Sequence, residues 1–224
     1  MKTTRRRRIL PTTALLLALL SIVAAGCGGG AGAPSATTTV SATGPSVQPP
    51  AGWKKFTGSG VEVYLPPAFQ GGDPSADVQN VVERLRALGP DYEDLAKVVE
   101  ADPSAFAIWV FDSTSATSGF LTNLNVVLDR VPAGVTLKEY IDATVKQLPG
   151  DFHIASRAEL RLNGREAARL VMEFTVQDVK GSQLIYLVKD PSGIWTITYS
   201  TSAAEFQTRL PDFEKSATTF RTGS

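Results

Sequence analysis

One residue, Cys27, limits most strongly how this chain can be stabilised. It is the sole cysteine of the sequence, and it ends the run Val23-Ala24-Ala25-Gly26-Cys27 after a basic start and an apolar segment from Leu15 to Val23. This order of basic, apolar and small residues is typical of an export signal. Because a single cysteine forms no internal disulfide, we expect the folded part to depend on its apolar core alone.

The small residues before Cys27 resemble the lipobox of bacterial lipoproteins, in which the thiol receives a diacylglyceryl group and a peptidase cuts just before it. The resemblance implies a signal peptide at residues 1–26 and a mature chain that begins at lipidated Cys27. Ordinary secretion after an Ala-x-Ala-like cut and an uncleaved anchor stay open. Pro11 and Ser21 interrupt the apolar stretch, which falls short of the roughly 20 apolar residues of a spanning helix. The run Arg6-Arg7-Arg8 also loosely matches a twin-arginine export signal.

Removal of the leader changes the charge of the protein. The whole chain carries 22 basic and 22 acidic residues, but five basic residues and no acidic ones lie in residues 1–26. The mature chain therefore holds 17 basic and 22 acidic residues, a net charge of −5. An acidic surface disfavours nucleic acid and gives no polybasic help to membrane binding. We expect no nucleic-acid partner, and attachment to the extracytoplasmic face of the cell membrane through the lipid on Cys27.

Composition predicts one folded domain. Residues 27–52 comprise Cys27 and a tether of Gly, Ala, Thr and Pro without charge, which has too little apolar surface to offset the entropy of ordering. From Trp53 onward, about 170 residues carry aromatic side chains throughout, a length typical of one domain. The predicted boundaries are therefore 1–26, 27–52 and 53–221.

Hydrophobic periodicity predicts a mixed α/β domain. We expect two helices within Asp73–Asp102, one behind a Thr136–Glu139 capping box, and one behind a Ser202–Glu205 capping box that Pro211 should kink or restart. The Asn163-Gly164 pair predicts a tight hairpin. Strands are expected at alternating or fully apolar runs: Trp53–Phe56, Val61–Leu65, Ala105–Phe111, Thr122–Val131, Phe152–Leu162, Arg165–Val176, Gln183–Lys189 and Ile194–Ser200.

The order of these elements and several short motifs are similar to those of a known superfamily. The motifs are Thr-Leu-Lys-Glu-Tyr at 136–140, Leu-Asn-Gly-Arg-Glu-Ala at 162–167, Gly-Ile-Trp-Thr-Ile-Thr-Tyr-Ser at 193–200 and Phe-Glu-Lys-Ser-Ala-Thr-Thr-Phe-Arg at 213–221. Together they resemble the PsbP-like superfamily, which includes DcrB and the LpqN-type lipoproteins of actinobacteria. The resemblance spans residues 53–221. It implies an α/β/α sandwich, with a mostly antiparallel sheet flanked by helices on both faces, and a role in assembly or binding without a shared catalytic constellation.

Residues with catalytic or metal-binding chemistry are sparse. Alternation places His153, the only histidine, on a polar strand face with Arg157, Glu159 and Arg161, where a solvated side chain is the expected outcome. One histidine and one lipidated cysteine exclude a zinc site of several His or Cys ligands. The carboxylates Asp73, Asp77, Asp91 and Asp94 match no calcium loop. We therefore expect no cofactor, no metal and no catalytic residue.

Two asparagines and three tryptophans remain as candidates for binding. Asn123 and Asn125 lie two residues apart on one face of a predicted strand, where they could line a polar binding face or simply meet water. Trp109 and Trp195 lie within apolar strands and are expected in the core. Trp53, at the domain edge, either closes the sheet or contacts lipid headgroups.

Two classes of function follow. The leading one is a lipid-anchored, non-enzymatic binding or assembly protein of the bacterial envelope, with an unknown envelope protein or lipid as its partner. The alternative is a small-molecule or lipid carrier with an apolar cleft between the helices of residues 75–101 and the sheet. A hydrolase working from carboxylates alone is the third, although the sequence pairs no activated nucleophile with a base.

Overall fold

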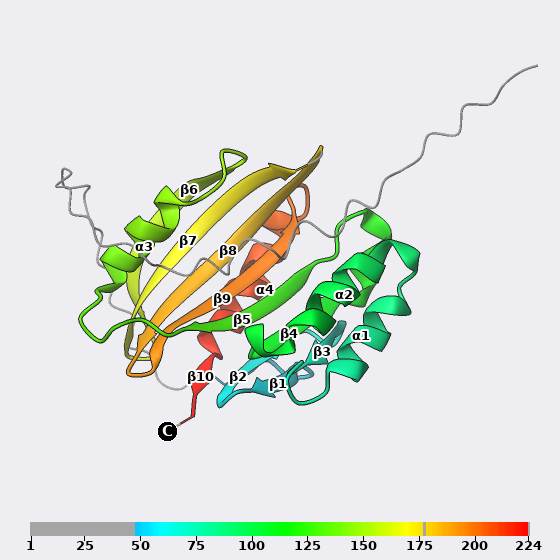
Figure 1. The fold of residues 1–224 in the computed structure, drawn as a ribbon, viewed down its shortest axis with the longest axis horizontal. Coiled ribbons are helices and arrows are strands. Elements are labelled where there is room, and N and C mark those ends of the chain that lie inside the picture. The colour runs from blue at the N-terminus through cyan, green and yellow to red at the C-terminus, as the bar shows by residue number, and fades with distance from the viewer. Residues whose placement is uncertain (1–47, 177, 224) are drawn as a thin grey trace, which may run out of the picture.

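The computed structural model describes residues 48–176 and 178–223, so Cys27 and the predicted leader lie outside the described residues (Figure 1). The helices are α1 (Val78–Arg86), α2 (Glu93–Ala101), α3 (Leu137–Lys146) and α4 (Phe206–Thr218). The strands are β1 (Lys54–Gly58), β2 (Val61–Leu65), β3 (Phe69–Gly72), β4 (Ile108–Asp112), β5 (Asn123–Asp129), β6 (Phe152–Leu162), β7 (Arg165–Val176), β8 (Val179–Asp190), β9 (Gly193–Ser202) and β10 (Arg221–Thr222).

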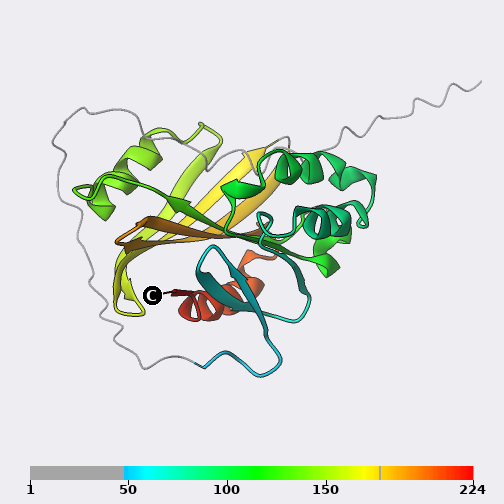
Figure 2. The same ribbon diagram turned by 60° about the horizontal axis from the view of Figure 1, so that its bottom comes forward.

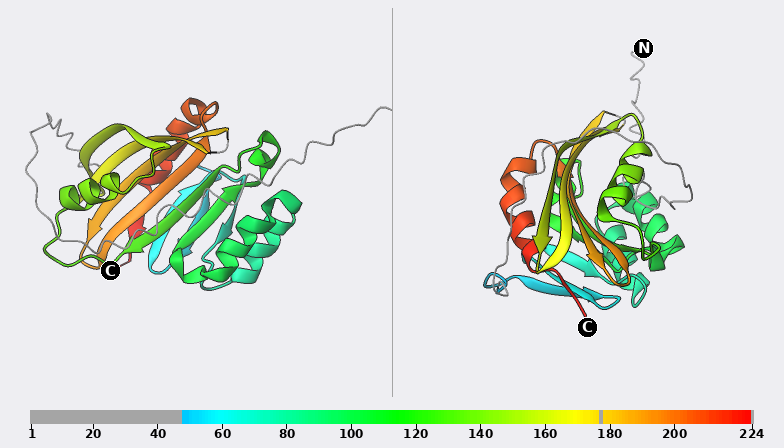
Figure 3. Two further views of the ribbon diagram at one scale, coloured as in Figure 1. Left: turned by 45° about the horizontal axis from the view of Figure 1, so that its top comes forward. Right: turned by 90° about the vertical axis from the view of Figure 1, so that its left-hand side faces the viewer.

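Seven strands form a large antiparallel sheet in the order β3-β4-β5-β9-β8-β7-β6. Figure 2 shows α1, α2 and α3 on one face of this sheet and α4 on the other. The edge-on view in Figure 3 places α3 and α4 on opposite sides. The predicted sandwich, a mostly antiparallel sheet with helices on both faces, is confirmed.

The first hairpin belongs to a second, smaller sheet. Strands β1, β2 and β10 form it, and β10 pairs with β2. The two residues between β1 and β2, Ser59 and Gly60, have φ values of 47° and 80°, which suit a tight hairpin turn. Its apolar side chains, including Val63 and Leu65, are buried in the same cluster as α4. The small sheet therefore covers the large sheet from the same side as α4.

The apolar core forms one cluster on the α4 side of the large sheet and two clusters on the opposite side. On the α4 side one cluster runs from β2 across the large sheet to β6. On the other side, one cluster lies under α1 and α2 and a separate one lies under α3. Trp109 is fully buried in the cluster under α1 and α2, and Trp195, which is 4% exposed, lies in the α4-side cluster. Both tryptophans are therefore core residues, as predicted.

The two helices within Asp73–Asp102 pack as core elements. Val81 is 2% exposed and Leu85 is fully buried, and both share a cluster with Trp109 and Phe111 of β4. The other side chains of β4, including Ile108, point into the α4-side cluster. Strand β4 is thus covered on both faces, and the prediction that the preceding helices supply one of the covers is confirmed.

A β-bulge in β6 makes one prediction wrong. The register with β7 shifts between Ile154 and Ser156, and one extra residue reverses which face the following side chains point to. His153 therefore lies opposite Glu173, while Arg157 is on the other face and bonds Asp142 of α3 at 2.6 Å. Arg157, Glu159 and Arg161 do not share a face with His153.

The turn and cap predictions have mixed outcomes. Asn163 and Gly164 form the expected two-residue turn, with φ values of 53° and 82°, and the capping box that opens α3 is complete. The second box is incomplete because Ser202 ends β9 and the Glu205 carboxylate accepts from Arg209 instead. Helix α4 runs through Pro211 without restarting. Buried side chains on both sides of the proline, such as Phe206 and Phe213, fix both halves to the core.

Candidate functional site

The face of the large sheet that carries α1, α2 and α3 has a strip of polar side chains along its middle. Register pairs Asn125 with Thr198, and it aligns Asn123 with Ser200 and Gln183 across three adjacent strands. Because paired residues point to the same face, these side chains gather between the cluster under α1 and α2 and the cluster under α3. We call this set the polar strip: Asn123, Asn125, Gln183, Thr196, Thr198 and Ser200.

Both asparagines singled out from the sequence lie in the polar strip. Asn123 is 9% exposed, and its Nδ2 donates to the Leu121 carbonyl at 2.9 Å. That bond ties Asn123 to the chain just before β5. Asn125 is half-buried and stands in register between Trp109 and Thr198. A binding role for the two asparagines stays a prediction, and Asn125 is the better placed of the two.

An apolar cavity of about 40 Å³ adjoins the polar strip, between α3 and strands β6 to β9. Ile141 and Val145 line it from the helix, and Leu170, Met172 and Ile185 line it from the sheet. Val145 is 37% exposed, so the C-terminal half of α3 covers the cavity only in part. Thr196 is the one member of the polar strip that lines the cavity.

A half-buried carboxylate, Asp129, lies next to this cavity. The Tyr140 hydroxyl and the Thr196 hydroxyl both donate to Asp129 Oδ2, the latter at 3.3 Å. Burial raises the pKa of Asp129 above its ordinary value, and these two hydrogen bonds offset only part of that rise. Burial and the bond to Asp129 also raise the pKa of Tyr140. The hydrogen bonds from Tyr140 and Thr196 to Asp129 therefore join α3 to β5 and β9.

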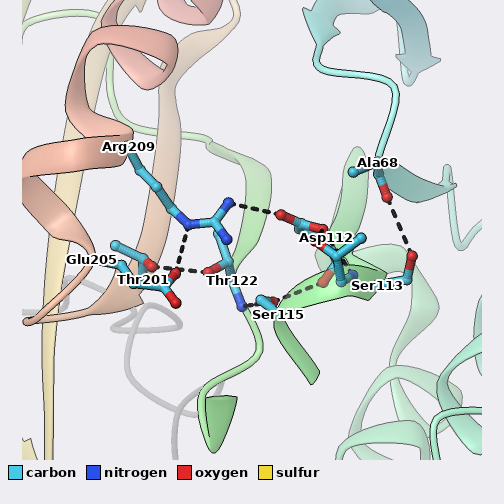
Figure 4. Close-up of polar contacts among 9 residues, drawn as sticks. Ala68, Asp112, Ser113, Ser115, Thr122, Thr201, Glu205 and Arg209 are labelled. Atoms are coloured by element: carbon cyan, nitrogen blue, oxygen red, sulfur yellow. Dashed lines mark hydrogen bonds and ion pairs between the residues drawn. The ribbon is translucent and has the colours of Figure 1, made fainter. Parts of the chain in front are cut away.

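A second carboxylate, Asp112, is buried at the end of β4 (Figure 4). Its Oδ2 accepts from Arg209 of α4 at 2.7 Å, and its Oδ1 accepts from the backbone and hydroxyl of Thr114 at 2.9 and 2.6 Å. Burial alone would raise the pKa of Asp112, but the hydrogen bonds from Thr114 and Arg209 outweigh burial and lower it. Arg209 is also held by Glu205 at 2.7 Å. All of these groups are paired, so the cluster connects α4 to the sheet.

Sequence reasoning missed the Asp112–Arg209 pair because its two residues are 97 positions apart. No local pattern relates them. The polar strip was found only through its β5 members, because Gln183, Thr198 and Ser200 join it through strand order rather than through spacing along the chain.

His153 lies at the surface, as predicted. Its side chain is 66% exposed, and its Nε2 is 3.2 Å from Glu173 Oε2. Both residues line a polar hollow of about 320 Å³ that also includes Asp151 and Lys180. Within the part of the chain that the structure describes, His, Cys, Asp and Glu form no group of three or more that could hold a metal.

Among the described residues, the helices expected to border a cleft at residues 75–101 pack directly on the sheet. The apolar faces of α1 and α2 are packed against β4, with Val82, Ala96 and Val99 fully buried. The apolar cavity described above lies instead under α3.

Comparisons with known proteins inform the fold. No family model and no curated protein matches the sequence. Among solved structures, the cyanobacterial PsbP of Synechocystis sp. PCC 6803 aligns over 81% of this chain and 95% of its own, with 14% identity and a TM-score of 0.50. LpqN of Mycobacterium tuberculosis, which is involved in cell envelope biogenesis, aligns over 83% and 89%, with 11% identity and a TM-score of 0.36. A Pseudomonas aeruginosa protein of unknown function aligns over 44% and 71%, with 16% identity and a TM-score of 0.41.

Over the described residues, no helix combines the length and the apolar character that crossing a bilayer requires. The likeness to cyanobacterial PsbP extends over most of both chains and concerns the arrangement of helices and strands. The chain has a PsbP-like fold.

Proposed function

We propose that this chain is a lipid-anchored, non-enzymatic binding or assembly protein on the extracytoplasmic face of a bacterial cell membrane. The observation that carries the proposal is the run from Val23 to Cys27 after an apolar segment, followed by an uncharged tether and one domain of PsbP-like fold. Two acyl chains on Cys27 would hold the protein firmly, since one chain alone binds a bilayer only marginally. The tether, with an r.m.s. reach of roughly 25–30 Å, would let the domain stand clear of the headgroups.

Two carboxylates with shifted pKa values, Asp112 and Asp129, make contacts between elements of the fold. A general acid or base must reach the proton that it transfers. Asp112 is occupied by Thr114 and Arg209, and Asp129 is occupied by Tyr140 and Thr196. Each therefore serves to join elements of the fold.

Cys27→Ala is the test of the anchor. We expect the parent to partition into the detergent phase after phase separation and to incorporate labelled palmitate, because the thiol carries the lipid. The variant should lose the label and leave the detergent phase. Cys27→Ser, which also lacks the thiol, should behave in the same way. A variant that stays in the detergent phase without label would show that the apolar segment itself is the anchor.

A carrier of a small apolar or amphiphilic molecule is a second candidate, favoured by the cavity under α3. The cavity is lined by apolar side chains and only partly covered by Val145, but its volume of about 40 Å³ is far below the roughly 300–1,000 Å³ of a typical ligand site. Helix α3 would have to shift outward to admit more than a short chain. The packing of α3 allows such movement, because Leu137 and Ile141 are its only buried residues.

Native mass spectrometry of the Cys27→Ala chain, purified without detergent, tests the carrier. We expect the chain to retain a bound molecule, and Val145→Trp to lose it because the larger side chain fills the mouth of the cavity. Val98→Trp is the matched control, since Val98 is 36% exposed on α2 and is not among the residues that line this cavity. If the Cys27→Ala chain without further substitution shows only the mass of the protein alone, the carrier hypothesis is wrong and a protein-binding module remains.

A further inference from the structure

The polar hollow of about 320 Å³ that includes His153 lies on the α4 side of the large sheet, where α4 begins. Side chains of β6, β7 and β8 line it from the sheet, and Phe206 and Gln207 line it from the helix. Figure 1 shows the start of α4 beside the end of the sheet at which β7 turns into β8. The volume reaches the roughly 300–1,000 Å³ of a typical ligand site, unlike the cavity under α3.

The first turn of α4 supplies backbone donors to this hollow. The Ala203 N–H donates to the Lys180 carbonyl at 3.0 Å, so the helix begins beside β8. Within the described residues, no side chain caps this end of α4, and the N–H groups of Phe206 and Gln207 have no backbone partner. The free N–H groups at the start of a helix carry a partial positive charge and favour an anion.

A buried hydroxyl and a cation lie on the same side of the hollow. Ser182 of β8 lines the hollow and is only 4% exposed, and its hydroxyl forms no hydrogen bond with another described residue. Lys180, two residues earlier on the same face of β8, also lines the hollow, and it forms no ion pair in the described part of the chain. Because folded proteins pair nearly all of their buried polar groups, the Ser182 hydroxyl is a group that a bound molecule would satisfy.

Carboxylates lie on the opposite side of the hollow. Strand register places Glu173 of β7 next to Ser182, and His153 of β6 next to Glu173. Glu173 Oε2 is 3.2 Å from His153 Nε2, and no described residue pairs with the other carboxylate oxygen. Asp151, just before β6, also lines the hollow. The hollow therefore has anion-binding groups towards β8 and α4, and two carboxylates towards β6 and β7.

The separation of the two sides limits the size of a ligand. Neighbouring strands lie about 4.8 Å apart, so Glu173 is about one strand spacing from Ser182 and His153 is about two. A simple anion would meet the repulsion of the Glu173 carboxylate, and a simple cation would leave the Ser182 hydroxyl and the helix end without a partner. A dipeptide, which spans at most roughly 7 Å, reaches both sides with charges of the right sign.

We propose that this hollow binds a short peptide with free termini, with its carboxylate at the α4 side and its ammonium group at the β6 side. The carboxylate would accept from the Phe206 N–H, Ser182 and Lys180. The ammonium group would donate to Glu173 and Asp151. This inference goes beyond the proposed function, since it depends neither on the lipid anchor nor on the cavity under α3.

The test compares three probes by calorimetric titration into the Cys27→Ala chain. The probes are alanyl-alanine, its N-acetyl derivative, which lacks the ammonium group, and its C-terminal amide, which lacks the carboxylate. We expect alanyl-alanine to bind at least about tenfold more tightly than either derivative, because each derivative loses one set of charge-assisted hydrogen bonds.

Substitutions on the two sides of the hollow should separate the two termini. Lys180→Gln and Ser182→Ala should each weaken alanyl-alanine and the N-acetyl derivative by about three- to tenfold and leave the amide unchanged. Glu173→Gln should weaken alanyl-alanine and the amide by a similar factor and leave the N-acetyl derivative unchanged. All three variants should keep the parental melting temperature, because neither side chain of the charged pair is buried and the Ser182 hydroxyl has no partner to lose.

Lys215→Gln on α4 and Glu166→Gln on β7 are the matched controls. Both side chains are exposed and neither lines the hollow, so binding of all three probes should be unchanged.

Other outcomes would overturn the proposal. Equal binding of the three probes, or no binding by any of them, would exclude a site for a zwitterion. Inorganic phosphate that binds as tightly as alanyl-alanine would show a simple anion site at the start of α4. Equal losses for all three probes in Lys180→Gln would show that the two termini are not bound on separate sides. Each of these results would leave the lipid anchor, and its own test, unaffected.

Discussion

Replacing Val81 or Leu85 with aspartate should prevent the domain from folding. Both side chains point from α1 into the cluster that also contains Trp109 and Phe111, and neither is more than 2% exposed. Each substitution would bury a carboxylate with no cation in that cluster, which costs many times the transfer free energy of a neutral polar group. The whole folding free energy of a domain is only about 5–15 kcal/mol. The expected result is loss of the cooperative thermal transition in both variants.

The matched control is Gln79→Asp. Gln79 lies on the exposed side of the same helix, and a negative charge in the first turn is favoured by the helix dipole. This variant should melt within about 0.5 kcal/mol of the parent, as is usual for surface changes. Circular dichroism melts of the three variants decide the matter. Parental melting temperatures for Val81→Asp and Leu85→Asp would mean that α1 opens away from the sheet and does not act as its cover.

The features that sequence reasoning predicted correctly are those with a local cause. Helices α1 and α2 carry apolar residues at helical spacing, the Thr136–Glu139 box opens α3, and Asn163-Gly164 closes the β6–β7 hairpin. In each case a few neighbouring residues determine the conformation. Assignment of Trp109 to the core follows from the same logic, because an unbroken apolar strand must be covered on both faces.

The features that were missed depend on strand order or on single insertions. One extra residue near Ala155 reverses the faces of β6, and no residue type there signals the bulge. Strand β10 has only two residues, so its pairing with β2 leaves no periodic pattern. Sequence reasoning predicted only the β5 members of the polar strip, because Asn123 and Asn125 share a face of β5 by alternation alone. Their neighbours Thr198 and Gln183 lie beside them only because β9 is inserted between β5 and β8.

Replacing Arg209 with methionine should destabilise the domain by roughly 3 kcal/mol at neutral pH, because it leaves the Asp112 carboxylate buried without its cation. We expect the lower end of the range for buried pairs, since the Arg209 side chain is 24% exposed whereas that of Asp112 is 5% exposed. Asp112→Asn removes the charge but keeps an acceptor for Thr114, and combining it with Arg209→Met should restore part of the lost stability. Urea unfolding of the parent, the two single variants and the double variant measures the coupling.

The pH dependence of the stability deficit of Arg209→Met distinguishes loss of the ion pair from loss of side-chain packing. In the parent, hydrogen bonds from Thr114 and Arg209 lower the pKa of Asp112 despite burial. Its contribution to stability is therefore present above about pH 4, the ordinary value for aspartate, and is lost as the pH falls through the lowered pKa. Arg209→Met removes one of the bonds that lower the pKa of Asp112, so that pKa rises relative to its value in the parent, and the deficit lessens as the pH falls and Asp112 becomes protonated. The deficit of Arg209→Met should thus be largest at pH 7 and shrink towards pH 3. A deficit that is equal at pH 7 and pH 3 would assign the effect of Arg209 to the packing of its aliphatic stem, and the ionic connection between α4 and β4 would be wrong.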